Sequence, residues 1–193
     1  MSTKFPQIFL VRHGETEWSL SGRHTGRSDI ALTENGEGAA RLVEGRIPQI
    51  HFDAVFSSPS QRARRTCELA GFGSKVEIDD NLAEWDYGRY EGITTKDIQT
   101  HSPGWNVFRD GCPDGESVSD VAARADVVIK KIRAVDGNVL IFSSSHFLRV
   151  LGARWLGLGA EAGSFFILDT TSISILGYEH NMQEPVVRSW NQT

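Results

Sequence analysis

Three runs of consecutive apolar residues along the chain predict buried strands. They lie at residues 8–11, 54–56 and 139–142, and Val76 with Ile78 marks one further strand. Strands without polar alternation are typical of a parallel sheet that helices cover on both faces. The hydrophobic pattern therefore predicts such a sheet as the centre of the molecule.

Between these strands the apolar positions follow a helical period. Residues 118–132 place apolar side chains at i, i+3, i+4 and i+7 behind a capping box of Ser117 and Asp120, which predicts an amphipathic helix. Three shorter helices are expected from Thr33 to about Glu44, from Ser60 to Ala70 and from Phe147 to about Leu156.

The C-terminal part of the chain shows a different order of elements. Residues 165–168, 173–176 and 186–187 are apolar and predict strands in hairpin-like succession. Strands that alternate with helices and then give way to an antiparallel section predict an α/β fold. We expect a three-layer α/β/α sandwich with a mostly parallel, mixed central sheet, in one domain of residues 1–193.

Polar side chains follow each predicted strand of the parallel section. Arg12 and His13 end the first strand, Arg62 follows the second, Glu84 the third and His146 the fourth. In an open α/β sheet these exits meet in the crevice where ligands bind. An imidazole can attack phosphorus, guanidinium groups match phosphoryl oxygens, and a carboxylic acid can protonate a leaving oxygen. The exits therefore favour phosphoryl transfer.

The composition of the chain limits the kinds of partner and cofactor that we expect. The 193 residues carry a net charge of −5 and are 39% apolar, which argues against a general nucleic-acid or membrane surface. The six histidines and two cysteines show no metal-ligand spacing, so we expect neither a metal nor another cofactor. The N-terminus lacks the apolar stretch of a signal peptide, and no run could span a bilayer, so we expect a cytoplasmic protein.

Five motifs in order resemble the histidine phosphatase superfamily, also called phosphoglycerate mutase-like. They are residues 10–16, 32–36, 57–63, 84–88 and 154–158, so the resemblance covers nearly the whole chain. It implies the phosphoglycerate mutase-like version of the predicted fold. It also implies a reaction that passes through a phosphohistidine.

The resemblance implies a role for each matching residue. His13 resembles the nucleophile, Arg12 and Arg62 the phosphate clamps, and Glu84 the donor of a proton to the leaving alkoxide. Ser19 falls where many relatives have a phosphate-binding asparagine, and a hydroxyl can still donate a hydrogen bond. The positions that match the substrate site of mutase relatives are Thr25, Gly26 and Tyr87.

Two further segments point to one branch of the superfamily. Residues 84–92 and 109–116 resemble the sedoheptulose-1,7-bisphosphatase branch, which implies a sugar phosphate or sugar bisphosphate as substrate. We expect Arg109 to hold a distal phosphate. The aromatic residues expected to enclose the sugar are Trp85, Tyr87, Tyr90 and Trp105.

The chain departs from the family pattern after the fourth strand. Ser144 falls at the position of the family's second catalytic histidine and Ser145 at the following glycine, whereas His146 lies two residues further on. A serine donates a hydrogen bond but brings no positive charge, and loss of one such contact typically costs about 100- to 1,000-fold in rate.

Ser144 and Ser145 are expected phosphate ligands. Three hypotheses follow from this departure: His146 takes over the missing role, Ser144 suffices alongside Arg12 and Arg62 with lower turnover, or the chain only binds phosphorylated ligands. We favour retained activity because the other catalytic residues are present. A mutase is the close alternative, but it requires a lid that excludes water, and 193 residues leave little chain for one. Whether the chain forms a homodimer stays open.

Overall fold

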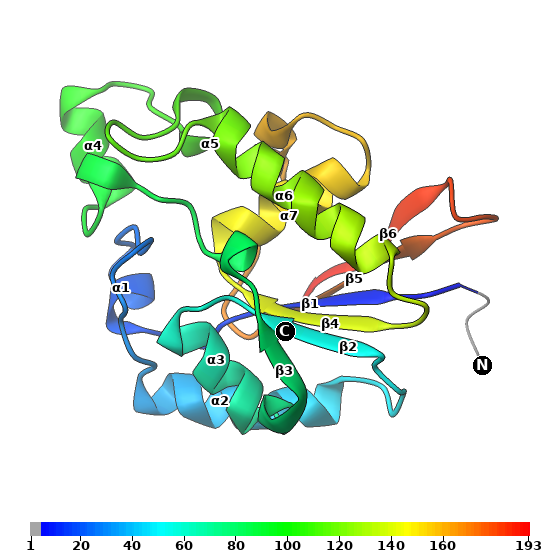
Figure 1. Cartoon of the computed structure of the whole chain (residues 1–193). Coiled ribbons are helices and arrows are strands. Elements are labelled where there is room, and N and C mark those ends of the chain that lie inside the picture. The colour runs from blue at the N-terminus through cyan, green and yellow to red at the C-terminus, as the bar shows by residue number, and fades with distance from the viewer. Residues whose placement is uncertain (1–4) are drawn as a thin grey trace.

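A six-stranded sheet with the strand order β3-β2-β4-β1-β5-β6 forms the centre of the computed structural model, which describes residues 5–193 (Figure 1). β1, β2, β3 and β4 are parallel neighbours, β5 is antiparallel to β1, and β6 is antiparallel to β5. The predicted mixed, mostly parallel sheet is confirmed. The strands are β1 (Ile8–Arg12), β2 (Ala54–Ser57), β3 (Val76–Ile78), β4 (Val139–Ser143), β5 (Ile173–Tyr178) and β6 (Pro185–Gln192).

Alternation along β1 divides the core into two layers. Ile8 and Leu10 pack on one face, among residues of α6 and α7, whereas Phe9 and Val11 pack on the other, among residues of α2 and α3. The two helix layers on either side of the sheet are visible in Figure 1. The α-helices are α1 (Glu17–Leu20), α2 (Glu34–Arg46), α3 (Gln61–Leu69), α4 (Thr95–His101), α5 (Val107–Asp110), α6 (Val118–Arg133) and α7 (Ser145–Trp155).

The longest helix, α6, forms where the sequence predicts it. The Ser117 side chain accepts from the backbone N–H of Asp120, and the Asp120 carboxylate accepts from the backbone N–H of Ser117, so the capping box is present. Val121, Ala125 and Val128 are buried on its core face. No helix within residues 5–193 combines the length and apolarity needed to cross a membrane.

The register of the parallel strands brings their carboxyl ends to one edge. Arg12 at the end of β1 pairs with Ser143 at the end of β4, and Ser57 at the end of β2 pairs with Phe142 of β4. α1 and α4 lie beyond this edge (Figure 1). The strand exits therefore open into the same region, as the sequence predicts.

One predicted strand is wrong. Phe165 ends a short 3-10 helix, η4 (Ala160–Phe165), and residues 166–168 belong to no strand. Side chains use carbonyls of this segment instead: Trp190 donates to Ile167 and Arg12 donates to Leu168. The apolar pattern misled because Phe165 and Ile167 are 86% and 71% exposed.

One helix boundary differs from the prediction, and three short helices were not predicted. α7 begins at Ser145 rather than Phe147, because the chain enters the helix directly after β4 with Ser144 in the N-cap position. The helix α1, which follows β1, was not predicted. The helices α4 and α5 were not predicted, since each is too short to show a clear apolar period. The remaining 3-10 helices are η1 (Gly73–Lys75), η2 (Asp80–Leu82) and η3 (Gly88–Tyr90).

Candidate active site

A cavity of about 230 Å³ lies at the carboxyl ends of β1 and β4. It collects most of the side chains that the sequence singles out, together with four residues from the loop before Thr25 and from α4. Its lining consists of Arg12, His13, Ser19, Gly22, Arg23, His24, Thr25, Glu84, Tyr87, Thr95, Ser145 and His146. Segments far apart in the sequence therefore contribute to one site.

His13 follows β1 and is 5% exposed. Its Nδ1 lies 2.7 Å from the carbonyl oxygen of Gly14, and because a carbonyl only accepts, Nδ1 carries the proton and Nε2 keeps its lone pair. Burial lowers the pKa of His13 well below its usual value of 6.5, and the neighbouring Arg62 and Arg12 lower it further. The ring is therefore a neutral imidazole with a free nucleophilic nitrogen.

Two guanidinium groups flank this ring. Arg62 comes from the first turn of α3, is fully buried, and donates to the carbonyl oxygens of Thr25, Gly26 and Ser28 at 2.9, 3.2 and 3.0 Å. Arg12 donates to the carbonyl oxygen of Leu168. Burial lowers the pKa of both groups, and nearby Glu84 opposes this effect.

Each of these arginines has one buried donor without a partner. The Nε atoms of Arg12 and Arg62 are buried and make no hydrogen bond. Buried donors in native proteins are nearly always paired, so an unpaired one indicates a ligand or solvent contact. Arg12 lines the cavity together with His13, whereas Arg62 is not among the lining residues and acts on the His13 ring through its charge. Guanidinium donors of this kind match the oxygens of a phosphoryl group.

The Glu84 carboxylate joins the loop after β3 to the start of α7. Its Oε1 accepts from the backbone N–H groups of Trp85 and Phe147 at 2.9 and 2.8 Å, and its Oε2 accepts from that of His146 at 3.0 Å. These contacts fix the carboxyl group at the N-terminus of α7, where the first backbone N–H groups of a helix have no partner within the helix. Glu84 lines the same cavity as His13.

Ser144 and its neighbours occupy the start of α7. Ser144 is 1% exposed, its Oγ has no hydrogen-bond partner, and it does not cap the helix with its side chain. Ser145 and His146 line the cavity. His146 Nδ1 shares a hydrogen bond of 2.5 Å with the Tyr87 hydroxyl.

Two of the predicted phosphate and substrate contacts have structural partners already. The Ser19 hydroxyl lines the cavity but forms the capping box of α1, where it accepts from the Thr16 N–H and donates to the Thr16 carbonyl, both at 2.9 Å. Gly26 does not line the cavity. A Cβ there would lie 2.4 Å from the carbonyl oxygen of Trp85, so glycine is required for close packing.

The structure does not bring Arg109 into this cavity. It lies on α5, pairs with Asp110 at 2.7 Å and donates to the carbonyl of Gly104, so its distal-phosphate role stays a prediction that this cavity does not support. Trp85 and Trp105 are buried, and their indole N–H groups donate to backbone carbonyls. Of the four aromatic residues expected around the sugar, Tyr87 alone is among the cavity residues.

Sequence reasoning missed four cavity residues: Gly22, Arg23, His24 and Thr95. They come from a loop and a short helix rather than from a strand exit, so the strand pattern gave no reason to group them. One signal in the sequence could have identified His24: it directly precedes Thr25, a position that the family resemblance assigns to the substrate site.

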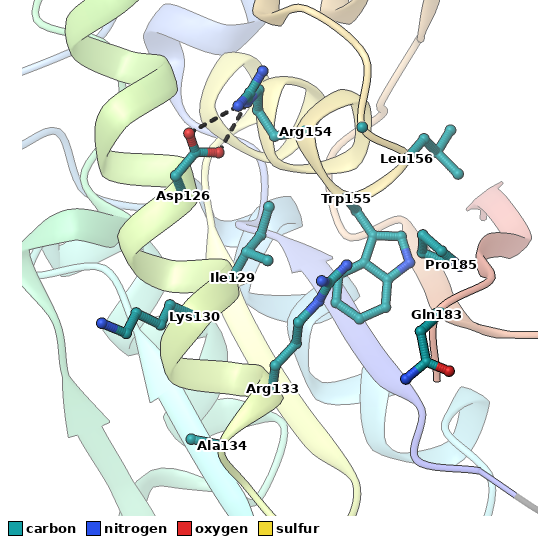
Figure 2. A pocket seen from close by; sticks show the side chains of 11 residues that line it. Asp126, Ile129, Lys130, Arg133, Ala134, Arg154, Trp155, Leu156, Gln183 and Pro185 are labelled. Atoms are coloured by element: carbon teal, nitrogen blue, oxygen red, sulfur yellow. Dashed lines mark hydrogen bonds and ion pairs between the residues drawn. The ribbon is translucent and has the colours of Figure 1, made fainter. Parts of the chain in front are cut away.

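A larger cavity of about 780 Å³ lies between the ends of α6 and α7 and the loop before β6 (Figure 2). Arg154 is bound there to both oxygens of Asp126, and Arg133 lies over the Trp155 ring. The basic residues occupy the last helical turns, where they complement the helix dipoles. This cavity holds no histidine, cysteine or serine. Among residues 5–193 no group of three or more His, Cys, Asp or Glu side chains is arranged to hold a metal ion.

Comparisons with known proteins agree with this geometry. An acid phosphatase of Mycobacterium tuberculosis is 40% identical and the alignment covers 97% of this chain and 94% of the relative. The sedoheptulose 1,7-bisphosphatase of Saccharomyces cerevisiae is 30% identical, with 97% and 93% covered. The solved structure of a Mycobacterium tuberculosis open reading frame product superposes with a TM-score of 0.92 at 39% identity and covers 97% of this chain and 98% of that one. The model of the histidine phosphatase superfamily (branch 1) matches residues 8–193, and the chain belongs to this superfamily.

Proposed function

We propose that this protein is a metal-independent phosphatase that hydrolyses a sugar phosphate or sugar bisphosphate through a phosphohistidine on His13. The observation that carries the proposal is the state of the His13 ring, whose Nδ1 is bound to the Gly14 carbonyl while Nε2 is free. The relatives named acid phosphatase and sedoheptulose bisphosphatase support a phosphatase.

In the first step Nε2 of His13 attacks phosphorus, and the bond between phosphorus and the ester oxygen breaks. The Nε atoms of Arg12 and Arg62 donate to the phosphoryl oxygens and offset the charge that develops on them. The carboxyl group of Glu84 gives its proton to the leaving alkoxide. The products of this step are the free alcohol and a phosphohistidine.

In the second step water attacks the phosphohistidine. The Glu84 carboxylate, now deprotonated, takes a proton from this water as the oxygen bonds to phosphorus, and the bond between phosphorus and Nε2 breaks. Inorganic phosphate leaves, His13 returns to its neutral form, and Glu84 is protonated again. The three backbone N–H groups around Glu84 keep its oxygens in place through both steps.

A phospho-ligand binder without turnover is the second candidate, and Ser144 is the observation that favours it. The serine supplies an unpaired buried hydroxyl instead of the family's second histidine. We propose that turnover is retained, because a hydroxyl can donate to a phosphoryl oxygen and the nucleophile, both arginines and the acid are present. A mutase reaction additionally requires the phosphohistidine to be shielded from water, and the sequence has little chain for a lid.

The test is hydrolysis of p-nitrophenyl phosphate in the presence of a chelator, by the parent chain and by His13→Ala. We expect activity to survive chelation and to disappear in His13→Ala, and an alkaline quench of labelled substrate to trap phosphohistidine only in the parent. His51→Ala is the matched control because His51 is exposed and remote from the cavity. Equal activity in His13→Ala and the parent would overturn the assignment of the nucleophile.

We further propose that the protein works in the cytoplasm. Both cysteines, Cys67 and Cys112, are free and buried, which suits a reducing compartment. Cell fractionation that places the tagged protein outside the cytoplasm would contradict this proposal.

A further inference from the structure

Two imidazole rings, those of His24 and His146, line the cavity next to the nucleophile, with ring centres 5.8 Å apart. Each ring has one nitrogen bound to a protein hydroxyl. His146 Nδ1 is bound to Tyr87 at 2.5 Å, and His24 Nε2 is bound to Thr95 at 3.2 Å. Within residues 5–193 the second nitrogen of each ring, His146 Nε2 and His24 Nδ1, has no hydrogen-bond partner.

Packing fixes the orientation of both rings. The His24 ring lies 4.6 Å from that of Tyr87 and 5.4 Å from that of Trp105, centre to centre. The His146 ring meets the Phe108 ring edge-on at 5.1 Å. Rotation of either ring out of the cavity wall would break these contacts together with the hydroxyl bond, so the wall is a preorganised surface.

This wall is uncharged near neutral pH. Burial lowers the pKa of His24 to about 4. Burial also lowers the pKa of His146 well below 6.5, and Arg149, His24 and Arg12 add to the effect. The Tyr87 phenol keeps its proton, because burial raises its pKa well above 10.

The charged groups around the two rings come from several elements. Arg12 is the last residue of β1, and Arg149 lies in α7. The Glu84 carboxylate accepts hydrogen bonds from backbone N–H groups at the start of α7. Arg23 is exposed at the edge of the cavity, one residue before His24. The charged residues that line the cavity together with the two imidazoles are therefore Arg12, Glu84 and Arg23.

A neutral imidazole nitrogen either donates or accepts a hydrogen bond, depending on the tautomer. A substrate hydroxyl can do both, so it fits the free nitrogen in either tautomer, whereas a carboxylate or phosphate only accepts and loses its solvation there. We propose that His24 and His146 form a recognition site for the hydroxyl groups of the leaving group, with Tyr87 and Thr95 as positioning residues. The inference rests on the proposed function, which places the phosphoryl group on His13.

The proposal names the substrate class more closely. The leaving group is a polyol with hydroxyls close to the ester oxygen, as in a sugar monophosphate. An anionic group next to the ester, as in a phosphorylated hydroxy acid, would lose its solvation against the two neutral imidazoles. Arg23 at the edge is the group that a competing, anion-directed specificity would use.

The test measures a selectivity ratio, kcat/KM for glucose 6-phosphate divided by kcat/KM for p-nitrophenyl phosphate, whose leaving group has no such hydroxyls. His24→Phe and His146→Phe keep a ring but remove the hydrogen bond, and we expect each to lower the ratio about tenfold or more. Tyr87→Phe, which keeps the ring that packs on His24, is expected to lower it about three- to tenfold. His24→Gln retains an amide and should recover most of the ratio.

Three outcomes would overturn the proposal. The first is an equal loss on both substrates in the Phe variants, which would make the rings merely structural. The second is a parent that prefers 3-phosphoglycerate to glucose 6-phosphate and loses this preference in Arg23→Ala. The third is a selectivity ratio that stays low in the conservative variant His24→Gln, although circular dichroism shows that this variant is folded.

A binding experiment separates failure of this inference from failure of the proposed function. In a His13→Ala background, where no turnover is expected, the dissociation constants of glucose 6-phosphate and p-nitrophenyl phosphate give the same selectivity without chemistry. Binding selectivity that depends on His24, together with a parent chain that hydrolyses neither ester, supports the recognition site and overturns the phosphatase. If hydrolysis by the parent depends on His13 but the binding selectivity does not depend on His24, the phosphatase is supported and the recognition site is overturned.

Discussion

The backbone N–H of His146 donates to Oε2 of Glu84 at 3.0 Å. Residues 62 positions apart are thereby joined at the first turn of α7, and the adjacent N–H of Phe147 donates to Oε1 at 2.8 Å. The helix that begins immediately after β4 therefore fixes the proposed proton donor opposite the nucleophile, which is anchored at the end of β1. The geometry of the site depends on these two parallel strands ending at the same level.

Glu84→Gln removes the proton but keeps a side-chain oxygen for the backbone donors. We expect kcat to fall about 100- to 10,000-fold on an alkyl phosphate such as glycerol 1-phosphate, because the alkoxide leaves poorly without a proton. The fall on p-nitrophenyl phosphate should be much smaller, since nitrophenolate needs no proton to leave. The control is Glu179→Gln at an exposed position. Equal losses on the two substrates would contradict the role of Glu84 as the acid.

Arg62→Lys keeps a positive charge but removes the planar guanidinium group. In the parent this group donates to three carbonyls, and its Nε has no partner. We expect kcat/KM to fall about 100-fold or more and the melting temperature to drop, because the buried carbonyl groups lose donors. Arg64→Lys on the exposed face of the same helix is the matched control. A parent-like kcat/KM in Arg62→Lys would show that Arg62 does not bind the phosphoryl group.

The parallel strands and their exits could be predicted because both signals are local in the sequence. A buried strand appears as an apolar run, and polar residues follow its end. The sequence alone therefore predicts that His13 and Glu84 lie near each other, and both line the cavity. His24 and Thr95 were not, since their proximity results from the antiparallel bridge between Arg23 and Thr94, which no short pattern reveals. The place of Arg109 outside the cavity could not be predicted either, because its pairing with Asp110 follows from the folded helix α5.

Stability should depend on pH through the buried histidines. Unfolded His24 binds a proton near pH 6.5 but folded His24 only near pH 4, so the unfolded state binds more protons between these values. The free energy of unfolding therefore falls as the pH is lowered through this window, and His24 accounts for about 2 kcal/mol of the loss between about pH 7 and pH 5. Urea unfolding should show a loss smaller by this amount in His24→Gln. An unchanged loss in that variant, with exposed His51→Gln as control, would contradict the prediction.

The rate should not depend on protonation of the nucleophile near pH 6.5. Burial, Arg62 and Arg12 lower the pKa of His13, so the imidazole stays neutral and nucleophilic below that pH. We expect kcat/KM for p-nitrophenyl phosphate, which reports the groups of the free enzyme, to show no enzyme-derived acid limb with a midpoint near pH 6.5. Such a midpoint would assign an ordinary pKa to His13 and contradict its buried environment.

Ser144→His tests how much catalysis the departure from the family pattern costs. The added imidazole can donate to the phosphoryl group and, when protonated, offset its charge, so we expect kcat on p-nitrophenyl phosphate to rise about 10- to 100-fold. Because Ser144 is buried, the larger side chain is also expected to lower stability by about 1–3 kcal/mol. Ser145→His is the control for an added ring at the neighbouring position.

The double variant Ser144→His/His146→Phe decides between the remaining hypotheses. If His146 had taken over the missing role, its removal would cost the parent far more than it costs Ser144→His, and the two effects would not add. The hydrogen bond of 2.5 Å to Tyr87 holds the His146 ring in the cavity wall, and our proposal assigns this ring to the hydroxyls of the leaving group, so we expect its loss to cost both chains by a similar factor. Strong non-additivity in kcat would instead show that His146 contacts the phosphoryl group and that Ser144 has no catalytic role.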